Sequence, residues 1–313
     1  MQSGKWSVVA ILREPREVLE RFVAWHLHQG ADRIFLYFDD PDDPGIPAMG
    51  RFGDRVVVTR CTEAFWEELG VLDAVNFTKR QNAAILHAYR QIKDGWVAVV
   101  DGDELMWSRD RPLSEVLASL PESDRSVVFR PVEYVNFPQQ PDRLLFRRFI
   151  DGDLLDKVFG IFAVYMNRNR GFAGHVTGKT LTRAGLEVSR AHPHWFVDAQ
   201  GKRITDGSKT LDDGCALLHF YFLNYADWRR KADFRLKAFR NGRRDLLLAK
   251  MNRLVKLGRE RKLRHLWSRL HQITPEQHDT MKAHDLLLEL DMDMKGIVHQ
   301  YFGEVEEHLR MAG

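Results

Sequence analysis

The amino-acid sequence predicts an α/β protein with a mostly parallel sheet flanked by helices and a helical C-terminal extension. Over the first 110 residues, short apolar runs alternate with helical patterns. Those runs contain few polar residues, which is typical of parallel strands covered on both faces. Beyond residue 225 the chain becomes rich in Arg, Lys, Leu and Ala. A chain of 313 residues suggests about two domains, which we place at 1–225 and 226–313.

The first strand is expected at Val8 to Leu12, a short apolar run. A helix follows Glu14–Pro15, because proline suits the first helical positions, and Gly30 ends that helix. Further along this part of the chain we expect strands over 33–38, 56–59 and 96–100 and a helix over 73–92.

After residue 125 the expected strands become shorter and are separated by Gly, Asp and Pro turns. The strand candidates are 127–132, 159–166 and 215–222. Helices are expected over 226–270 and from Pro275 to about residue 311.

Composition narrows the class of protein. Hydrophobic residues make up 44% and charged residues 29%, as in ordinary globular proteins. Two cysteines, Cys61 and Cys215, exclude a disulfide framework and a four-thiolate zinc site, and we expect two inert buried thiols. The sequence shows neither a signal-peptide pattern nor a long apolar run, so we expect a cytoplasmic protein.

Charge is concentrated in residues 226–272, which hold sixteen Lys and Arg against four acids. This segment therefore carries +12, and the rest of the chain carries −9 of a total of +3. One interpretation is a solvated basic face. The other is a surface for an anionic acceptor, such as a lipid-linked phosphate or an acidic glycan precursor, or for peripheral contact with the inner membrane face. No stacking motif supports a nucleic-acid partner.

Asp101-Gly-Asp-Glu104 directly follows the apolar run 96–100. Alternate residues of an extended chain point to one side, so Asp101 and Asp103 can approach one ion together. Two carboxylates suit Mg²⁺ or Mn²⁺ and leave ligand positions open for phosphate oxygens. The simpler alternative is an acidic turn after a strand.

These features resemble the family-2 glycosyltransferases that use nucleotide-sugars, over roughly residues 6 to 235. The ordered matches are residues 11–30, 31–40, Lys79-Arg-Gln-Asn82 and 96–105, of which the last, with its Asp-x-Asp, is the most specific. Weaker matches are Tyr134–Phe137, Gly178–Lys179 and Leu218–Tyr221. The bacterial branch usually has Lys-Asn-Glu where this chain has Arg13-Glu14.

The resemblance implies a GT-A fold, a Rossmann-like domain that binds a nucleotide-diphospho-sugar, usually UDP-linked. It implies a metal held by Asp101 and Asp103, Mn²⁺ or Mg²⁺, which neutralises the leaving diphosphate. The residues expected to bind the nucleotide-sugar are Arg13, Glu14, Asp39, Asp40, Gln81, Asp101 and Lys179.

Family-2 enzymes are generally inverting, so a general base is expected near the acceptor hydroxyl. Glu133, at a predicted strand end, is our first candidate, ahead of Asp151, Asp153 and Asp156. His219 is the predicted third metal ligand, since late loops supply one in GT-A enzymes. His192 and His194 are the alternatives, and a packed histidine among aromatic residues is the structural interpretation of all three.

The predicted function is thus metal-dependent transfer of a sugar to an unknown acceptor. Two other functions stay open: a non-catalytic nucleotide-sugar-binding protein on a transferase fold, and a nucleotidyltransferase. A glycine-rich phosphate loop after the first strand would indicate a nucleotidyltransferase. This chain has Arg-Glu-Pro-Arg there, at residues 13–16.

Overall fold

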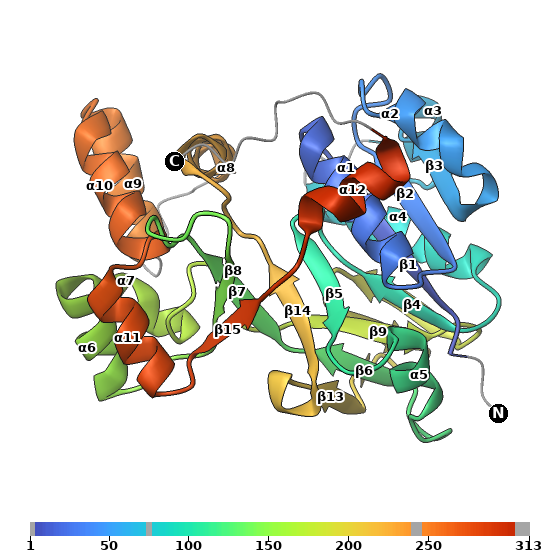
Figure 1. Ribbon diagram of the computed structural model, residues 1–313. Coiled ribbons are helices and arrows are strands. Elements are labelled where there is room, and N and C mark those ends of the chain that lie inside the picture. Colours follow the sequence, from blue (N-terminus) through green and yellow to red (C-terminus); the bar gives the residue numbers. More distant parts are fainter. Residues whose placement is uncertain (1–3, 73–76, 239–245, 304–313) are drawn as a thin grey trace. The chain divides into compact units, whose positions relative to one another are not determined.

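A computed structural model describes residues 4–72, 77–238 and 246–303 (Figure 1). The chain divides into two compact units, each discontinuous in sequence. Of the described residues, the first unit comprises 4–72, 77–131, 177–217 and 293–303, and the second comprises 132–176, 218–238 and 246–292. The fold class is mixed α/β, with a largely parallel central sheet flanked by helices.

The central sheet of the first unit has seven strands in the order β13-β6-β9-β4-β1-β2-β3. The neighbouring strands β4, β1, β2 and β3 run parallel to one another. Strand β9 runs antiparallel to both of its neighbours, β4 and β6, and β13 is parallel to β6. The strands of this sheet are β1 (Trp6–Leu12), β2 (Arg33–Phe38), β3 (Val56–Arg60), β4 (Trp96–Val99), β6 (Ser126–Phe129), β9 (Lys179–Arg183) and β13 (Gly207–Lys209).

The other elements of the first unit are mostly helices and a small antiparallel ribbon, β10-β11-β12. The helices are α1 (Arg16–His28), α2 (Ile46–Met49), η1 (Gly50–Arg55), α3 (Glu63–Glu68), α4 (Phe77–Gln91), α5 (Leu113–Ala118), η4 (Leu211–Asp213) and α12 (Met294–Phe302). The remaining strands are β5 (Glu104–Ser108), β10 (Val188–His192), β11 (Trp195–Asp198) and β12 (Arg203–Ile204). Strand β14 (Cys215–His219) begins in this unit and ends in the second.

The first unit has a two-sided core because its central strands are apolar on both faces. All seven residues of β1 are buried. Val9 and Ile11 face a cluster that contains Ala84, Ile85 and other residues of α4. Successive strand residues point to opposite faces, so the even-numbered residues of β1 pack on the other side of the sheet. Late in the chain, α12 returns and lies beside α1 (Figure 1).

Helix α1 begins and ends as the sequence predicts. Pro15 occupies the N-cap position with φ −54°, and the missing amide hydrogen of proline costs nothing there. Gly30 follows the helix with φ +84°, a conformation that glycine adopts without steric cost.

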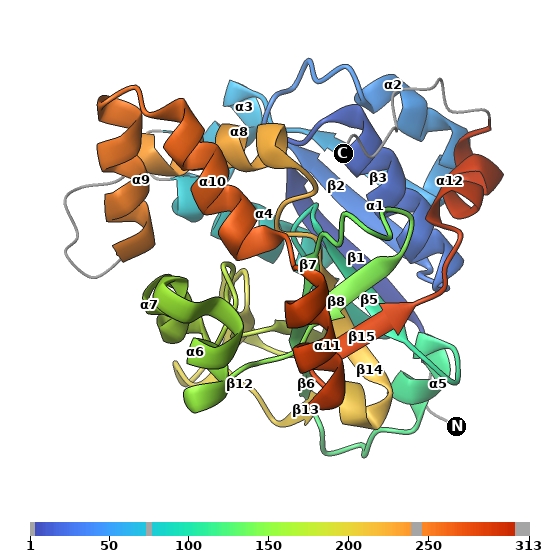
Figure 2. The same ribbon diagram turned by 60° about the vertical axis from the view of Figure 1, so that its left-hand side comes forward.

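The second unit packs helices against an antiparallel ladder, β15-β8-β7. Its strands are β7 (Pro131–Val135), β8 (Leu144–Arg147) and β15 (Leu287–Leu290). Its helices are α6 (Asp153–Phe159), η2 (Gly160–Phe162), α7 (Ala163–Met166), η3 (Asn167–Asn169), α8 (Tyr225–Ala238), α9 (Leu246–Lys256), α10 (Glu260–His271) and α11 (Pro275–Ala283). Helices α9 and α10 pack side by side (Figures 1 and 2). One apolar cluster joins the helices and the ladder, with Trp228, Leu263 and Leu270 among its most buried members.

Two expected elements are wrong. Residues 159–166 form helical turns instead of a strand, because their burial follows a helical period: Phe159, Ala163 and Met166 are buried, while Ile161 and Val164 are exposed. The helix expected from Pro275 to about 311 is interrupted by strand β15, which pairs with β8. The part of this helix beyond residue 303, and the start of the helix expected over 73–92, lie outside the described residues.

Candidate functional site

Polar residues gather at the carboxyl edge of the parallel strands. Strands β1, β2 and β4 end in the same direction and lead into Arg13-Glu14, Asp39-Asp40 and Asp101. Ligands of open α/β sheets bind beyond this edge. Gly102 lies close to the β1 end: a Cβ atom there would come within 2.9 Å of Leu12 and 3.0 Å of Glu14. Glycine therefore lets the acidic turn approach the end of β1.

A buried lysine stands inside the acidic turn. Lys179 Nζ, on β9, donates to Asp101 Oδ2 at 2.7 Å and lies 3.2 Å from Glu104 Oε2. The Lys179 and Glu104 side chains are 1% and 0% exposed, whereas that of Asp101 is 40% exposed. Burial opposes the lysine charge, yet the two carboxylates raise the pKa of Lys179 above its ordinary value. Two residues that the sequence places at the donor site, Asp101 and Lys179, thus contact each other.

The start of α4 adds polar groups at the same edge. Gln81 Nε2 lies 3.5 Å from Asp101 Oδ1, and Arg80 lies 3.8 Å from Asp39 Oδ1. Within the described residues, three atoms here are buried without a hydrogen-bond partner: Asp39 Oδ1, Arg80 Nε and Asn82 Oδ1. Buried polar atoms in native proteins are nearly always hydrogen-bonded, so a polar ligand at this edge of the sheet could supply the missing hydrogen bonds.

The remaining predicted residues of this edge lie nearer to solvent. Arg13 and Asp40 are exposed, and Glu14 and Asp103 are half-buried. The Asp40 carboxylate accepts the amide hydrogen of Asp42 at 3.0 Å and so closes the turn after β2. In this turn the structure buries Glu104 more deeply than Asp103.

In the second unit, Glu133 is fixed in the core. Its fully buried carboxylate is paired with the buried guanidinium of Arg147 and accepts the amide hydrogens of Ala173 and Gly174 at 3.0 and 2.6 Å. Burial alone would raise the pKa of Glu133, but Arg147 and two nearby histidines hold it below its ordinary value. A buried carboxylate with a lowered pKa is a poor proton acceptor. This arrangement favours a role in holding the 173–174 backbone over the predicted role as general base.

Two histidines lie next to this anchored turn. The ring centroids of His175 and His219 are 5.0 Å apart. Gly174 leaves room for the His219 ring, because a Cβ at Gly174 would lie 2.7 Å from His219 Cε1. A third histidine, His271, is buried against Phe222, and burial lowers its pKa to about 3.

Among the described residues, Glu104 of the first unit and the neighbouring His175 and His219 of the second unit could serve as metal ligands. Glu104 and His219 are buried, and His175 is half-buried. His219 is the predicted histidine ligand, and His175 and Glu104 are additional candidates beside the predicted Asp101 and Asp103. Sequence reasoning missed His175 because it lies in a glycine-containing turn without a motif. Glu104 could have been predicted as a ligand, because it is the acidic residue that directly follows the Asp-x-Asp motif.

The other predicted histidines belong to the β10–β11 ribbon. His194 Nδ1 is 2.7 Å from the Gly178 carbonyl oxygen, beside Lys179 in the chain. The rings of His192 and Trp195 are stacked, with their centroids 4.1 Å apart. Burial, together with the nearby charges of Lys179 and Arg203, lowers the pKa of His192. These contacts fit the structural interpretation of both histidines.

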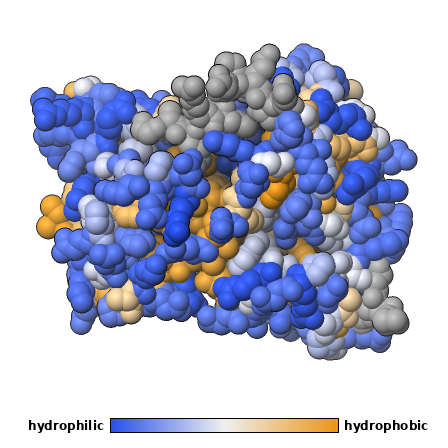
Figure 3. All heavy atoms as spheres, viewed as in Figure 1, coloured by the Kyte–Doolittle hydropathy of each residue, from blue (hydrophilic) through white to orange (hydrophobic). Residues whose placement is uncertain are grey.

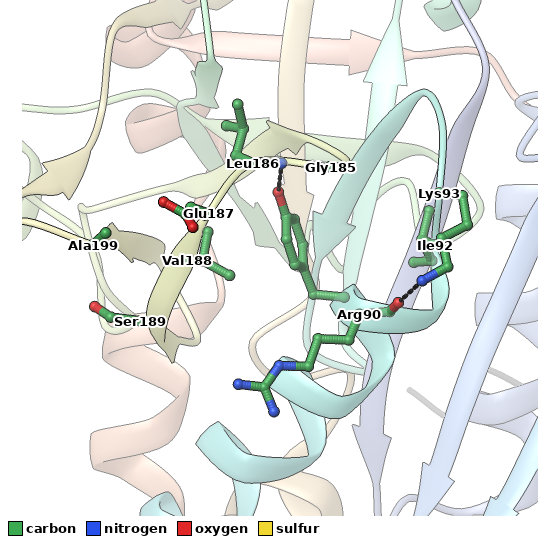
Figure 4. A pocket seen from close by; sticks show the side chains of 10 residues that line it. Arg90, Ile92, Lys93, Gly185, Leu186, Glu187, Val188, Ser189 and Ala199 are labelled. Carbon is green, nitrogen blue, oxygen red and sulfur yellow. Dashed lines mark hydrogen bonds between the residues drawn. The ribbon is translucent and has the colours of Figure 1, made fainter.

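A pocket of about 370 Å³ lies elsewhere in the first unit (Figure 4). It is lined by Tyr89 and Arg90 from the end of α4 and by residues 185–189. The Tyr89 hydroxyl accepts the Leu186 amide hydrogen at 3.1 Å (Figure 4). The end of α4 leads to the amino end of β4, so this pocket is at the sheet edge opposite Asp101.

Comparisons with known proteins do not assign a family. No protein-family model matches the chain, and no curated protein matches it. HddC from Yersinia pseudotuberculosis is 12% identical, with 72% of this chain and 96% of that chain covered and a TM-score of 0.34. A mycobacterial protein is 13% identical, with 66% of each chain covered and a TM-score of 0.30. Likenesses this weak carry no argument about function.

Within the described residues, none of the helices has the length and apolar character needed to cross a bilayer.

Proposed function

We propose that this protein is a metal-dependent glycosyltransferase that transfers a sugar from a nucleotide-diphospho-sugar. The observation that carries the proposal is the set of buried polar atoms without a hydrogen-bond partner on Asp39, Arg80 and Asn82, next to the acidic turn at the carboxyl edge of the sheet. This is where an open α/β sheet binds a nucleotide. The strand order of the first unit, with β9 antiparallel between β4 and β6, supports a GT-A architecture.

The residues of the acidic turn suit a diphosphate. Lys179 supplies a buried positive charge that contacts Asp101 and Glu104. Asp39 and Gln81 can bond to the hydroxyl and amide groups of a nucleoside. Of the predicted ions, Mn²⁺ fits a ligand group with two imidazoles better than Mg²⁺ does. We propose His175 and His219 as its ligands, and the bound ion would offset the charge that develops on the leaving diphosphate.

The proposal assigns no residue as the general base that would deprotonate the acceptor hydroxyl. Glu133 anchors the turn that precedes His175. Asp151 is paired with Arg170, which lowers the pKa of Asp151, and Asp153 and Asp156 are exposed on α6.

Calorimetry with UDP and UDP-sugars in the presence of Mn²⁺ tests the donor site. Asp39→Asn should weaken nucleotide binding about 10- to 100-fold, the value of a hydrogen bond to a charged group. Asp42→Asn, in the same turn but 94% exposed, is the matched control and should bind like the wild type. Absence of nucleotide binding, or equal binding by both variants, would overturn the proposal. Binding without release of UDP from any sugar donor would favour the non-catalytic alternative.

A further inference from the structure

The outer face of α9 combines basic and large apolar side chains. Leu246, Lys250, Arg253 and Leu257 are spaced by four, three and four residues, so they form one stripe along the helix. All four are exposed, and the leucines are 52% and 57% exposed. Met251 and Leu254 of the same helix are buried and pack into the core of the second unit.

Helix α10 is also rich in basic residues and adds to the positive charge of α9. Residues 246–271 contain eight Lys and Arg and one acid, Glu260. Glu260 already accepts a hydrogen bond from the Tyr225 hydroxyl and lies 3.8 Å from Arg229. Its charge is thus engaged inside the unit, whereas Arg261 and Lys262 point to solvent as exposed side chains.

Exposed apolar residues also cluster in this region. Of the five large apolar side chains that are exposed among the described residues, four lie in the second unit, and Leu72 is the exception. Besides the two leucines, these are Ile161, 87% exposed, and Val164. Segment 160–166 contacts α9, and Phe162 contacts His265 and Arg269 of α10. In Figure 3 this side, at left, shows a hydrophilic surface over α9 and α10 with hydrophobic residues below it.

We propose that this face of the second unit binds a membrane surface that carries anionic lipids. Two features favour a membrane as the partner. The high positive charge of this face attracts anionic headgroups, and the half-exposed leucines among the charges can insert among acyl chains. A soluble polyanion such as RNA would match the charge, but it gives the leucines no apolar surface to enter. The proposal is independent of the sugar-transfer function.

Sedimentation of the full chain with lipid vesicles tests this proposal. The protein should sediment with vesicles of phosphatidylcholine and phosphatidylglycerol, more weakly at high salt, and not with phosphatidylcholine alone. Lys250→Gln with Arg253→Gln should lower the partition coefficient about 25-fold, since each basic residue near the surface contributes about fivefold. Leu246→Ser with Leu257→Ser should also lower it, by about fivefold for each half-exposed side chain.

Matched controls lie in the first unit. Arg90→Gln with Lys93→Gln removes two exposed charges, and Leu72→Ser removes a leucine that is 44% exposed. Both should sediment like the wild type, and circular dichroism checks that every variant is folded. Equal sedimentation with both kinds of vesicle overturns the proposal. Loss of binding in the charge variant with full binding in the leucine variant also overturns it, and points to a soluble polyanion.

Discussion

Breaking the buried ion pair between Glu133 and Arg147 should destabilise the second unit strongly. Both side chains are fully buried, and the Arg147 guanidinium also donates to the Leu270 carbonyl oxygen at 2.9 Å. Glu133→Gln leaves the arginine charge unpaired in the core and turns one amide donor toward the backbone amide hydrogens of the 173–174 turn. Removal of one partner of a buried pair costs about 3–5 kcal/mol.

This loss in the free energy of unfolding is measured by urea denaturation at pH 7, monitored by circular dichroism. The matched control is Asp285→Asn, because Asp285 pairs with Arg148 at 2.6 Å but its side chain is 86% exposed. Exposed pairs contribute about 0–1 kcal/mol. Glu133→Gln together with Arg147→Met leaves no buried charge and should cost less than the sum of the single variants. If Glu133→Gln costs no more than Asp285→Asn, Glu133 is not anchored as described, and its role as a general base is open again.

Three further variants test other contacts. Lys179→Met leaves the buried Glu104 carboxylate without its cation and should cost about 3–5 kcal/mol at pH 7, which urea unfolding measures. Burial lowers the pKa of His26 to about 4. Between pH 6.5 and 4, this histidine therefore binds a proton in the unfolded chain but not in the folded protein. Stability should therefore fall by up to about 1.4 kcal/mol per pH unit between pH 6.5 and 4, and His26→Gln should flatten this slope; an unchanged slope would refute the assignment. Gly174→Ala should displace the neighbouring imidazole and weaken Mn²⁺ binding in calorimetry, whereas Gly50→Ala, with open space around it, should bind like the wild type.

Much of the first unit could be predicted from local patterns. Continuous apolar runs such as 33–38 mark strands buried on both faces, and Gly30 marks a helix end. The acidic turn at 101–104 was found because its residues are contiguous and follow a strand. Lys179, 78 residues away, was assigned to the donor site only through the resemblance, and its contact with Asp101 was not predicted, because the pairing of β4 with β9 leaves no local signal.

The second unit was harder to predict because distant segments complete its ladder and its core. Strand β15 pairs with β8, which lies about 140 residues earlier in the chain, and the short run 287–290 resembles part of a helix until that pairing is known. His175 lies in a turn that is held by Glu133, 41 residues away from Gly174. Spacing within the sequence does not encode such contacts.

The most direct test of the proposed activity is a thermal-shift screen of nucleotides and nucleotide-sugars with and without Mn²⁺. One nucleotide should raise the melting temperature only with the metal present, since a ligand at 100 times its Kd stabilises by about 2.7 kcal/mol. His175→Ala and His219→Ala should abolish the metal dependence. If no nucleotide shifts the melting temperature with Mn²⁺, or if both variants respond like the wild type, the proposed metal-dependent donor site is contradicted.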